Sequence, residues 1–132
     1  SWPGHLIQAE ARAALGAPTW MYQLDVPAPE AGGVLGAFHT LDIPLVFDNT
    51  RVPEARTGDT PAARRLAGTM ADAFVRFART GDPNGGGLPE WPRFTLDPRA
   101  TMIFDRDVRV ENDPRREERL LFAVAPYVKP GG

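Results

Sequence analysis

The longest segment with a clear periodicity begins at Pro61 and runs to about Arg79, and it sets the architecture. Thr60 precedes it as an N-cap residue, and Pro61 fills the first helical position, where a missing N–H costs nothing. Arginines and Asp72 lie off the apolar face. We therefore predict an amphipathic helix with a solvated outer face and a core-facing stripe. The stripe consists of Leu66, Met70, Ala73, Phe74 and Phe77.

Two elements are predicted before this helix. Residues 6–15 are alanine-rich and helix-favouring, and Gly16 is a suitable residue to end them. His5 would lie just before this first helix, at the surface. Residues 19–26 alternate between apolar and less apolar side chains, which predicts a β-strand that Pro27 ends.

A glycine-rich turn should end the long helix. Residues 81–87 contain three consecutive glycines, but no Gly-Lys-Ser/Thr ending and no helix start follow, so the segment does not match a phosphate-binding loop. We expect Trp91 and Phe94 to hold the following loop against the core.

The last third predicts a small hairpin and a short helix. Residues 101–104 and 108–110 have β character and are separated by a short polar link. Asp113 followed by Pro114 is a helix-start signal. Residues 129–132 should form a disordered tail.

The composition excludes several classes of function and site. A chain of 132 residues fits one domain, and 42% hydrophobic with 24% charged residues is ordinary for a globular protein. A net charge of −2 gives no electrostatic footprint for nucleic acid. There is no cysteine and no apolar run of membrane-spanning length. We expect a soluble protein without cofactor or metal, either cytoplasmic or secreted.

The stretch with the most chemical interest surrounds His39. Gly32, Gly33 and Gly36 precede it and give the backbone access to positive φ. Residues 45–47 follow it and have strand or core character. An imidazole ordinarily titrates near pH 6.5, so a histidine presented on such a loop can accept a proton near neutral pH.

Three segments resemble the type-B carboxylesterases, the cholinesterase-like branch of the α/β-hydrolases that includes bacterial para-nitrobenzyl esterases. The first is Gly-Ala-x-His-x-x-acid-Ile-Pro-x-Val-Phe from Gly36 to Phe47, which is similar to the family's catalytic histidine segment. The second, MADAFVRFARTGDPNGGGLPEWP at residues 70–92, is similar to its long C-terminal helix and Thr-Gly-Asp-Pro-Asn turn. Residues 101–105 are similar to a short strand near its C-terminus.

This resemblance implies an α/β fold, namely the C-terminal portion of an α/β-hydrolase. Residues 1–132 would be an incomplete catalytic-domain segment with a sheet strand, a histidine loop, a long helix, a short hairpin and a terminal helix. His39 would be the general base of a serine esterase. Gly36 and Asp42 would support the histidine loop, whereas the triad acid would come from an earlier strand.

The nucleophile is absent. Ser1 is the only serine, and no Gly-x-Ser-x-Gly elbow occurs. The resemblance therefore implies a carboxylesterase fragment that needs the missing N-terminal part to act on an ester. One alternative is a non-catalytic cholinesterase-like interaction module. Another is a metal-binding domain that uses His39 with Asp42 or Asp48, although one histidine with scattered carboxylates is a poor transition-metal site.

The predicted partners follow from the same argument. The strand at residues 19–26 would lack neighbours, and an unpaired strand edge favours association. We expect an N-terminal esterase polypeptide or a second copy of this chain as partner, an ester as small-molecule substrate, and neither nucleic acid nor a membrane.

Overall fold

A computed structural model describes residues 2–125 of the chain. The chain divides into two compact units, and the division passes through all three strands. Unit 1 comprises Ser1–Met21, Pro92–Thr101 and Glu111–Gly132. Unit 2 comprises Tyr22–Trp91 and Met102–Val110.

The strands form one small mixed sheet in the order β1-β2-β3. They span Met21–Leu24 (β1), Ala100–Phe104 (β2) and Arg109–Asn112 (β3). The Asp25 N–H donates to the Phe104 carbonyl at 2.9 Å, so the carboxyl ends of β1 and β2 lie together and the pair is parallel. Residues 105–108 join β2 to β3, and so short a link permits only an antiparallel pair. The predicted hairpin is confirmed.

Burial follows the sheet order. Every residue of the central strand β2 is buried, and Met102, Ile103 and Phe104 have no exposed surface. β1 is half-buried along its length and is shorter than the predicted strand over residues 19–26. Among the described residues, β1 is an edge strand.

The long helix of unit 2 agrees closely with its local signals. It is α3, Pro61–Thr80, and the Thr60 hydroxyl accepts a hydrogen bond from the Ala63 N–H at 3.1 Å. Gly81 ends it in the left-handed conformation, and its N–H donates to the Phe77 carbonyl at 2.8 Å. Phe77 departs from the predicted stripe, because 48% of it is exposed. The buried residues are Leu66, Ala67, Met70 and Ala73.

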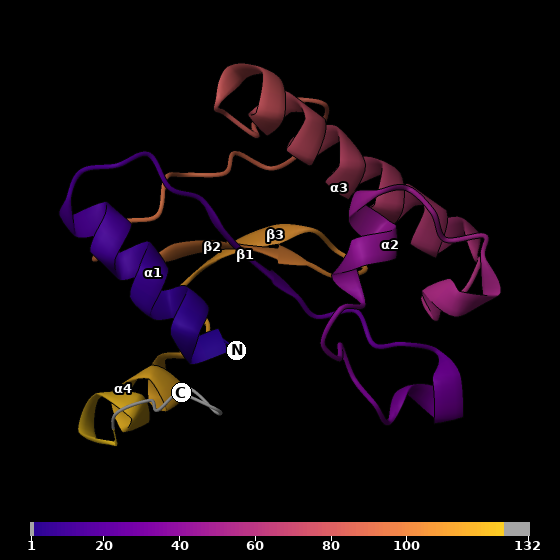
Figure 1. Cartoon of the computed structure of the whole chain (residues 1–132), viewed down its shortest axis with the longest axis horizontal. Coiled ribbons are helices and arrows are strands. Elements are labelled where there is room, and N and C mark those ends of the chain that lie inside the picture. The colour runs from indigo at the N-terminus through magenta and orange to yellow at the C-terminus, as the bar shows by residue number, and fades with distance from the viewer. Residues whose placement is uncertain (1, 126–132) are drawn as a thin grey trace. The chain divides into compact units, whose positions relative to one another are not determined.

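The segment after His39 is helical, so for residues 45–47 the predicted strand character is wrong, whereas the alternative core character holds for Leu45. Asp42–Val46 form the short helix α2, which Figure 1 shows beside α3. Leu41 and Leu45 are both 1% exposed, whereas Phe47 is 76% exposed. An i, i+4 pair on one face is the helical pattern, and a run of so few apolar residues does not reveal it in the sequence.

Short turns complete unit 2. Single 3₁₀ turns lie at Glu30–Gly33 and Pro53–Ala55. After α3, the Asn84 side chain accepts from the Trp91 N–H at 2.7 Å and donates to the Trp91 carbonyl at 3.0 Å. Trp91 packs edge-on against Phe104, with ring centroids 5.7 Å apart. This confirms the predicted holding role of Trp91.

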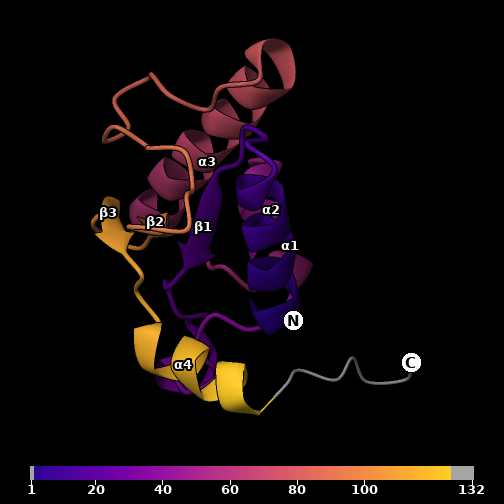
Figure 2. The same cartoon turned by 90° about the vertical axis from the view of Figure 1, so that its left-hand side faces the viewer.

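Unit 1 holds the first and last helices. α1 spans Trp2–Ala14, so it begins earlier than the predicted start at residue 6, and His5 lies within it at the surface. Leu6 and Ala9 pack with Phe94, which is 2% exposed and therefore also takes its predicted core position. α4 spans Arg116–Val124 and lies beside the N-terminal end of α1 in both views (Figures 1 and 2).

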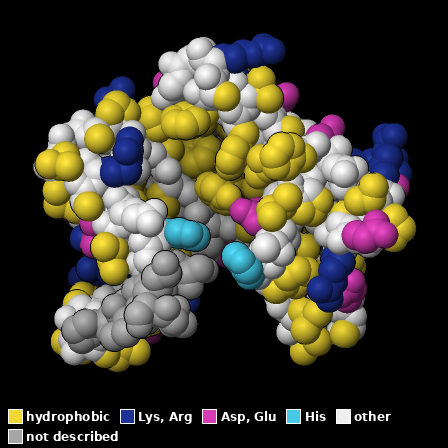
Figure 3. Space-filling view, viewed as in Figure 1, with side chains coloured by type: hydrophobic (Ala, Val, Ile, Leu, Met, Phe, Trp, Pro, Cys, Tyr) yellow, Lys and Arg dark blue, Asp and Glu magenta, His cyan; other side chains and the backbone are white. Residues whose placement is uncertain are grey.

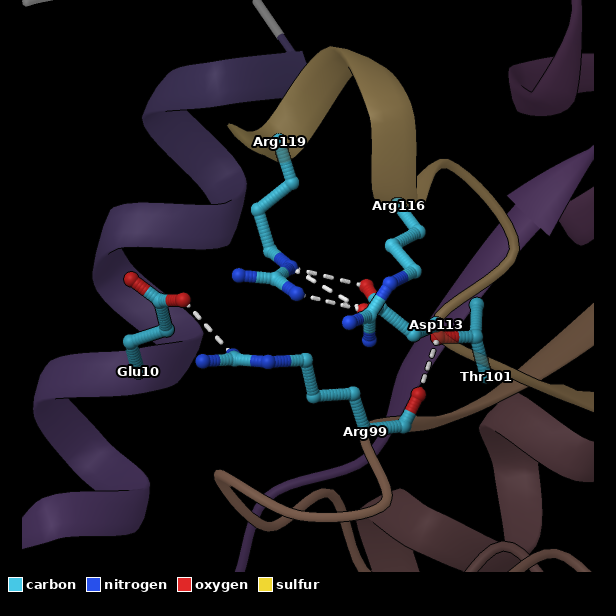
Figure 4. A network of polar contacts seen from close by, with 6 residues as sticks. All are labelled: Glu10, Arg99, Thr101, Asp113, Arg116 and Arg119. Carbon is cyan, nitrogen blue, oxygen red and sulfur yellow. Dashed lines mark hydrogen bonds and ion pairs between the residues drawn. The ribbon is translucent and has the colours of Figure 1, made fainter. Parts of the chain in front are cut away.

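α4 begins at Arg116, later than the helix start predicted at Asp113 and Pro114, because the Asp113 carboxylate binds arginine side chains instead of capping the helix. Its carboxylate accepts hydrogen bonds from Arg119 at 2.9 and 2.6 Å, and Arg116 lies 3.7 Å away (Figure 4). The Asp113 N–H donates to the Arg99 carbonyl at 3.2 Å, and the Arg99 guanidinium pairs with Glu10 at 2.6 Å. A carboxylate committed to these contacts does not cap the helix. The predicted tail, residues 129–132, lies outside the described residues.

Candidate functional site

His39 lies in the tight turn that leads into α2. The Leu41 N–H donates to the Phe38 carbonyl at 3.2 Å, and Thr40 adopts a positive φ of 75°. The imidazole is exposed, and it forms no hydrogen bond or ion pair with the described residues. Histidine side chains reach the surface in Figure 3. The turn therefore presents a ring whose two nitrogens are free to meet a reacting group.

Gly36 shapes the chain just before this turn. It takes a φ of +58°, its N–H donates to the Gly33 carbonyl, and its carbonyl accepts from the Ala28 N–H, both at 3.0 Å. A side chain would be strained at this φ. The sequence-predicted loop residue thus lies at a position that suits glycine.

Asp42 starts α2 and is held by a strand. The Tyr22 hydroxyl, from β1, donates to Asp42 Oδ2 at 2.8 Å. This contact joins the first turn of α2 to the sheet. The role of Asp42 in supporting the histidine loop, and not as the triad acid, stays a prediction. The hydrogen bond to Tyr22 is the kind of contact that such a role requires.

Tyr22 is itself fixed by aromatic packing. Its ring meets Phe74 of α3 and Phe104 of β2 edge-on, with centroids 5.7 Å apart in each pair. Burial raises the pKa of the Tyr22 phenol well above its ordinary value, and the hydrogen bond to the Asp42 carboxylate and its charge raise it further. The phenol therefore stays a neutral donor at physiological pH.

A second support of the turn was not predicted from the sequence. The Arg56 guanidinium lies over the Phe38 ring, 4.6 Å from its centroid, and forms a bidentate ion pair with Glu30. Arg56 holds the pKa of the Glu30 carboxyl below its usual range through these hydrogen bonds. No local signal links Glu30 to Arg56, because 26 positions separate them in the chain.

The remaining sequence candidates do not form a site. His5 is an exposed residue of α1. Within residues 2–125, no group of three or more histidine, cysteine or acidic side chains is placed to hold a metal ion. The metal-binding alternative, His39 with Asp42 or Asp48, therefore has no ligand set in this part of the chain. Ser1 lies outside the described residues.

A family model described as the carboxylesterase family matches residues 4–122. This chain belongs to the carboxylesterase family. It is 36% identical over 105 residues to the para-nitrobenzyl esterase of Bacillus subtilis (strain 168). This match covers 78% of this chain and 21% of that enzyme. It is 33% identical over 108 residues to phenmedipham hydrolase of Pseudarthrobacter oxydans, covering 78% of this chain and 22% of that protein.

Solved structures agree with the family. A Geobacillus stearothermophilus carboxylesterase at pH 6.2 superposes with a TM-score of 0.77 at 41% identity, over 89% of this chain and 24% of that one. A structure titled PNB esterase superposes with a TM-score of 0.78 at 34% identity, over 90% of this chain and 24% of that one. These neighbours are α/β-hydrolase carboxylesterases, so the predicted fold class is confirmed. The chain spans about a fifth to a quarter of the length of the relatives it matches.

No helix among residues 2–125 combines the length and the apolar character that crossing a bilayer requires.

Proposed function

We propose that this chain supplies the catalytic histidine, His39, of a serine carboxylesterase. The observation that carries the proposal is the presentation of an unengaged imidazole on a turn that is anchored on both sides. Asp42 is tied to Tyr22 on one side, and Phe38 lies under Arg56 on the other. The family pattern around the histidine is intact, and family membership supports an ester as substrate.

In this mechanism His39 acts as a general base and then as a general acid. It takes the proton of a serine hydroxyl as that oxygen attacks the ester carbonyl, and it gives the proton to the alcohol that leaves. In deacylation it takes a proton from water, which attacks the acyl ester, and returns it to the serine oxygen. The bond to the alcohol and one bond of water are broken, and a carboxylic acid and an alcohol are formed.

The serine, the triad acid and the oxyanion hole would come from a second polypeptide segment. This chain has no Gly-x-Ser-x-Gly elbow, and we propose that by itself it does not hydrolyse esters. Edge strand β1 and exposed apolar side chains around the histidine turn support such a partner. These side chains are Val34, Leu35, Ile43 and Phe47.

A chimaera tests the proposal. The segment of the Bacillus subtilis para-nitrobenzyl esterase that matches this chain is replaced by this chain, and hydrolysis of p-nitrophenyl butyrate is measured. We expect activity in the chimaera and a loss of at least roughly 10³-fold in kcat for His39→Ala, because removal of a triad base leaves only binding and oxyanion stabilisation. His5→Ala, at an exposed histidine outside the turn, is the matched control and should keep the activity.

Three results would count against the proposal. A folded chimaera without activity would favour the alternative, a non-catalytic interaction module. An active chimaera in which His39→Ala has no effect would remove the proposed role of the histidine. Turnover by this chain alone, lost in His39→Ala, would refute its dependence on a second segment.

A further inference from the structure

A cavity of about 770 Å³ lies within unit 2. Its walls come from the loop after β1, from α2, from the first turns of α3 and from residues 105–108. Ligand pockets commonly have volumes of roughly 300–1,000 Å³, so this cavity has room for a small organic molecule. His39 does not line it.

The inner wall of the cavity is apolar. Leu41, Leu45 and Leu66 line it and are 1%, 1% and 7% exposed, so they fix this wall between α2 and α3 but leave almost no free surface of their own. Val26 and Val108 extend this wall from the sheet side. A short hydrocarbon chain placed here would exchange water for contact with side chains that are already ordered.

The charged residues of the cavity carry a net positive charge. Arg65 and Arg106 line it and are exposed, and their guanidinium groups form no ion pair or hydrogen bond with the described residues. The one lining carboxylate, Asp105, lies 3.6 Å from Arg109. By contrast, the arginines at positions 56, 64, 99 and 119 each pair with an acid within the chain. The two lining guanidiniums therefore remain available to an anion.

We propose that this cavity binds an amphiphilic monocarboxylate of medium chain length. The carboxylate lies between Arg65 and Arg106, where guanidinium groups offer paired N–H donors, and the alkyl chain covers the half-buried side chains of Val26 and Val108. The proposal does not rest on the role of His39. It adds a second binding site, since its lining excludes the histidine and the apolar side chains exposed around the histidine turn.

Octanoate is the test ligand, and its binding to this chain is measured by isothermal titration calorimetry at low salt. We expect one site per chain, and a loss of affinity of roughly tenfold in the double variant Arg65→Gln/Arg106→Gln, because two partly exposed ion pairs disappear. Arg79→Gln, an exposed arginine at the other end of α3, is the matched control and should bind as the parent chain does.

Two further measurements separate charge from apolar contact. Octanol should bind the parent chain and the double variant equally, since it lacks the carboxylate. Ala62→Phe places a ring at an exposed lining position and should weaken both ligands without touching either arginine. His39→Ala should bind octanoate unchanged.

The proposal is overturned if octanoate does not bind, if it binds no more tightly than octanol, or if Arg79→Gln lowers its affinity as much as the double variant does. An effect of His39→Ala on octanoate binding would place the ligand at the histidine turn instead. Circular dichroism of each variant confirms that it is folded before binding is compared.

Discussion

Tyr22 links the chemistry of the histidine turn to the core. Its ring is held between Phe74 and Phe104, and its hydroxyl reaches Asp42 at the start of α2. One residue of a strand thereby fixes the helix that follows the catalytic candidate. Disturbing this hydroxyl should affect both stability and the position of the turn.

We predict that Tyr22→Phe lowers the free energy of unfolding by about 1 kcal/mol at neutral pH, because Asp42 loses a half-buried hydrogen-bond donor. The folded-state pKa of Tyr22 lies above the ordinary value of 10.0. The unfolded chain therefore releases the phenol proton first, and stability is full below pH 10 and falls as pH rises beyond it. Urea unfolding at several pH values up to 11 measures this loss.

The loss above pH 10 should be absent in Tyr22→Phe and only reduced in Asp42→Asn, because burial of the phenol, the larger cause of the shift, remains in that variant. An alkaline loss of equal size in all three proteins would contradict the assignment to Tyr22.

At the scale of elements, α4 depends on charged contacts more than on burial. The residues of α4 are half-buried or exposed, and Leu121 and Val124 are 61% and 80% exposed. It is attached within unit 1 by the Asp113–Arg119 pair, by the ring contact of Phe122 with Trp2 at 6.2 Å and by Arg115 over the Trp2 ring. Hydrogen bonds from Arg119 hold the pKa of the Asp113 carboxyl below its usual range.

We predict that Asp113→Asn costs about 1–3 kcal/mol at neutral pH, since Arg119 keeps only a weaker partner. A depressed carboxyl pKa stabilises the fold above the unfolded value of 3.8, and this contribution is lost as pH falls through the folded-state pKa. Unfolding followed by circular dichroism between pH 7 and 2 should show a larger acid loss in the parent chain than in Asp113→Asn, where the depressed pKa values of other carboxyls such as Glu30 still contribute.

Arg116→Gln is the control for this element. Arg116 is 69% exposed and lies 3.7 Å from the same carboxylate, so its removal should change stability by less than about 1 kcal/mol. If Arg116→Gln were as costly as Asp113→Asn, the network in Figure 4 would be held by long-range charge and not by the Arg119 hydrogen bonds.

At the scale of the whole molecule, the free edge of β1 is the feature that we expect to govern association. The Asp25 N–H faces β2, and successive residues of a strand point their N–H groups to opposite sides. The N–H groups of Tyr22 and Leu24 therefore face the free edge among the described residues. Such an edge is a template for another strand.

We predict that the isolated chain self-associates through this edge. Leu24→Pro removes one of the outward N–H groups with which a second strand would pair. Proline is tolerated on an edge strand where its nitrogen faces outward, so the variant should still fold. Light scattering at high concentration should therefore shift from a dimer or larger species towards the monomer. Gln23→Pro is the contrasting variant. Its N–H faces β2, so it should lower stability instead. A monomeric parent chain would refute the prediction.

How much of this protein can be read from its sequence differs between its parts. α3 was predicted almost to the residue, because Thr60, Pro61 and Gly81 are local signals that act on their own neighbours. The pattern of its own stretch singles out His39, whose catalytic role stays a prediction. The helical state of residues 42–46 was missed, since short apolar runs fit a strand as well as a helix until a neighbouring element chooses between them. The start of α1 was missed because Pro3 and Gly4 are poor helix formers.

The contacts that give the histidine turn its shape were decided only by the tertiary structure. Tyr22 meets Asp42 across 20 positions of sequence, and Glu30 meets Arg56 across 26. The cavity likewise joins residues from Val26 to Val108. Propensity and periodicity act over a few residues, so they determine which elements form. Which side chains meet depends on how those elements pack, and packing is set by the whole core at once.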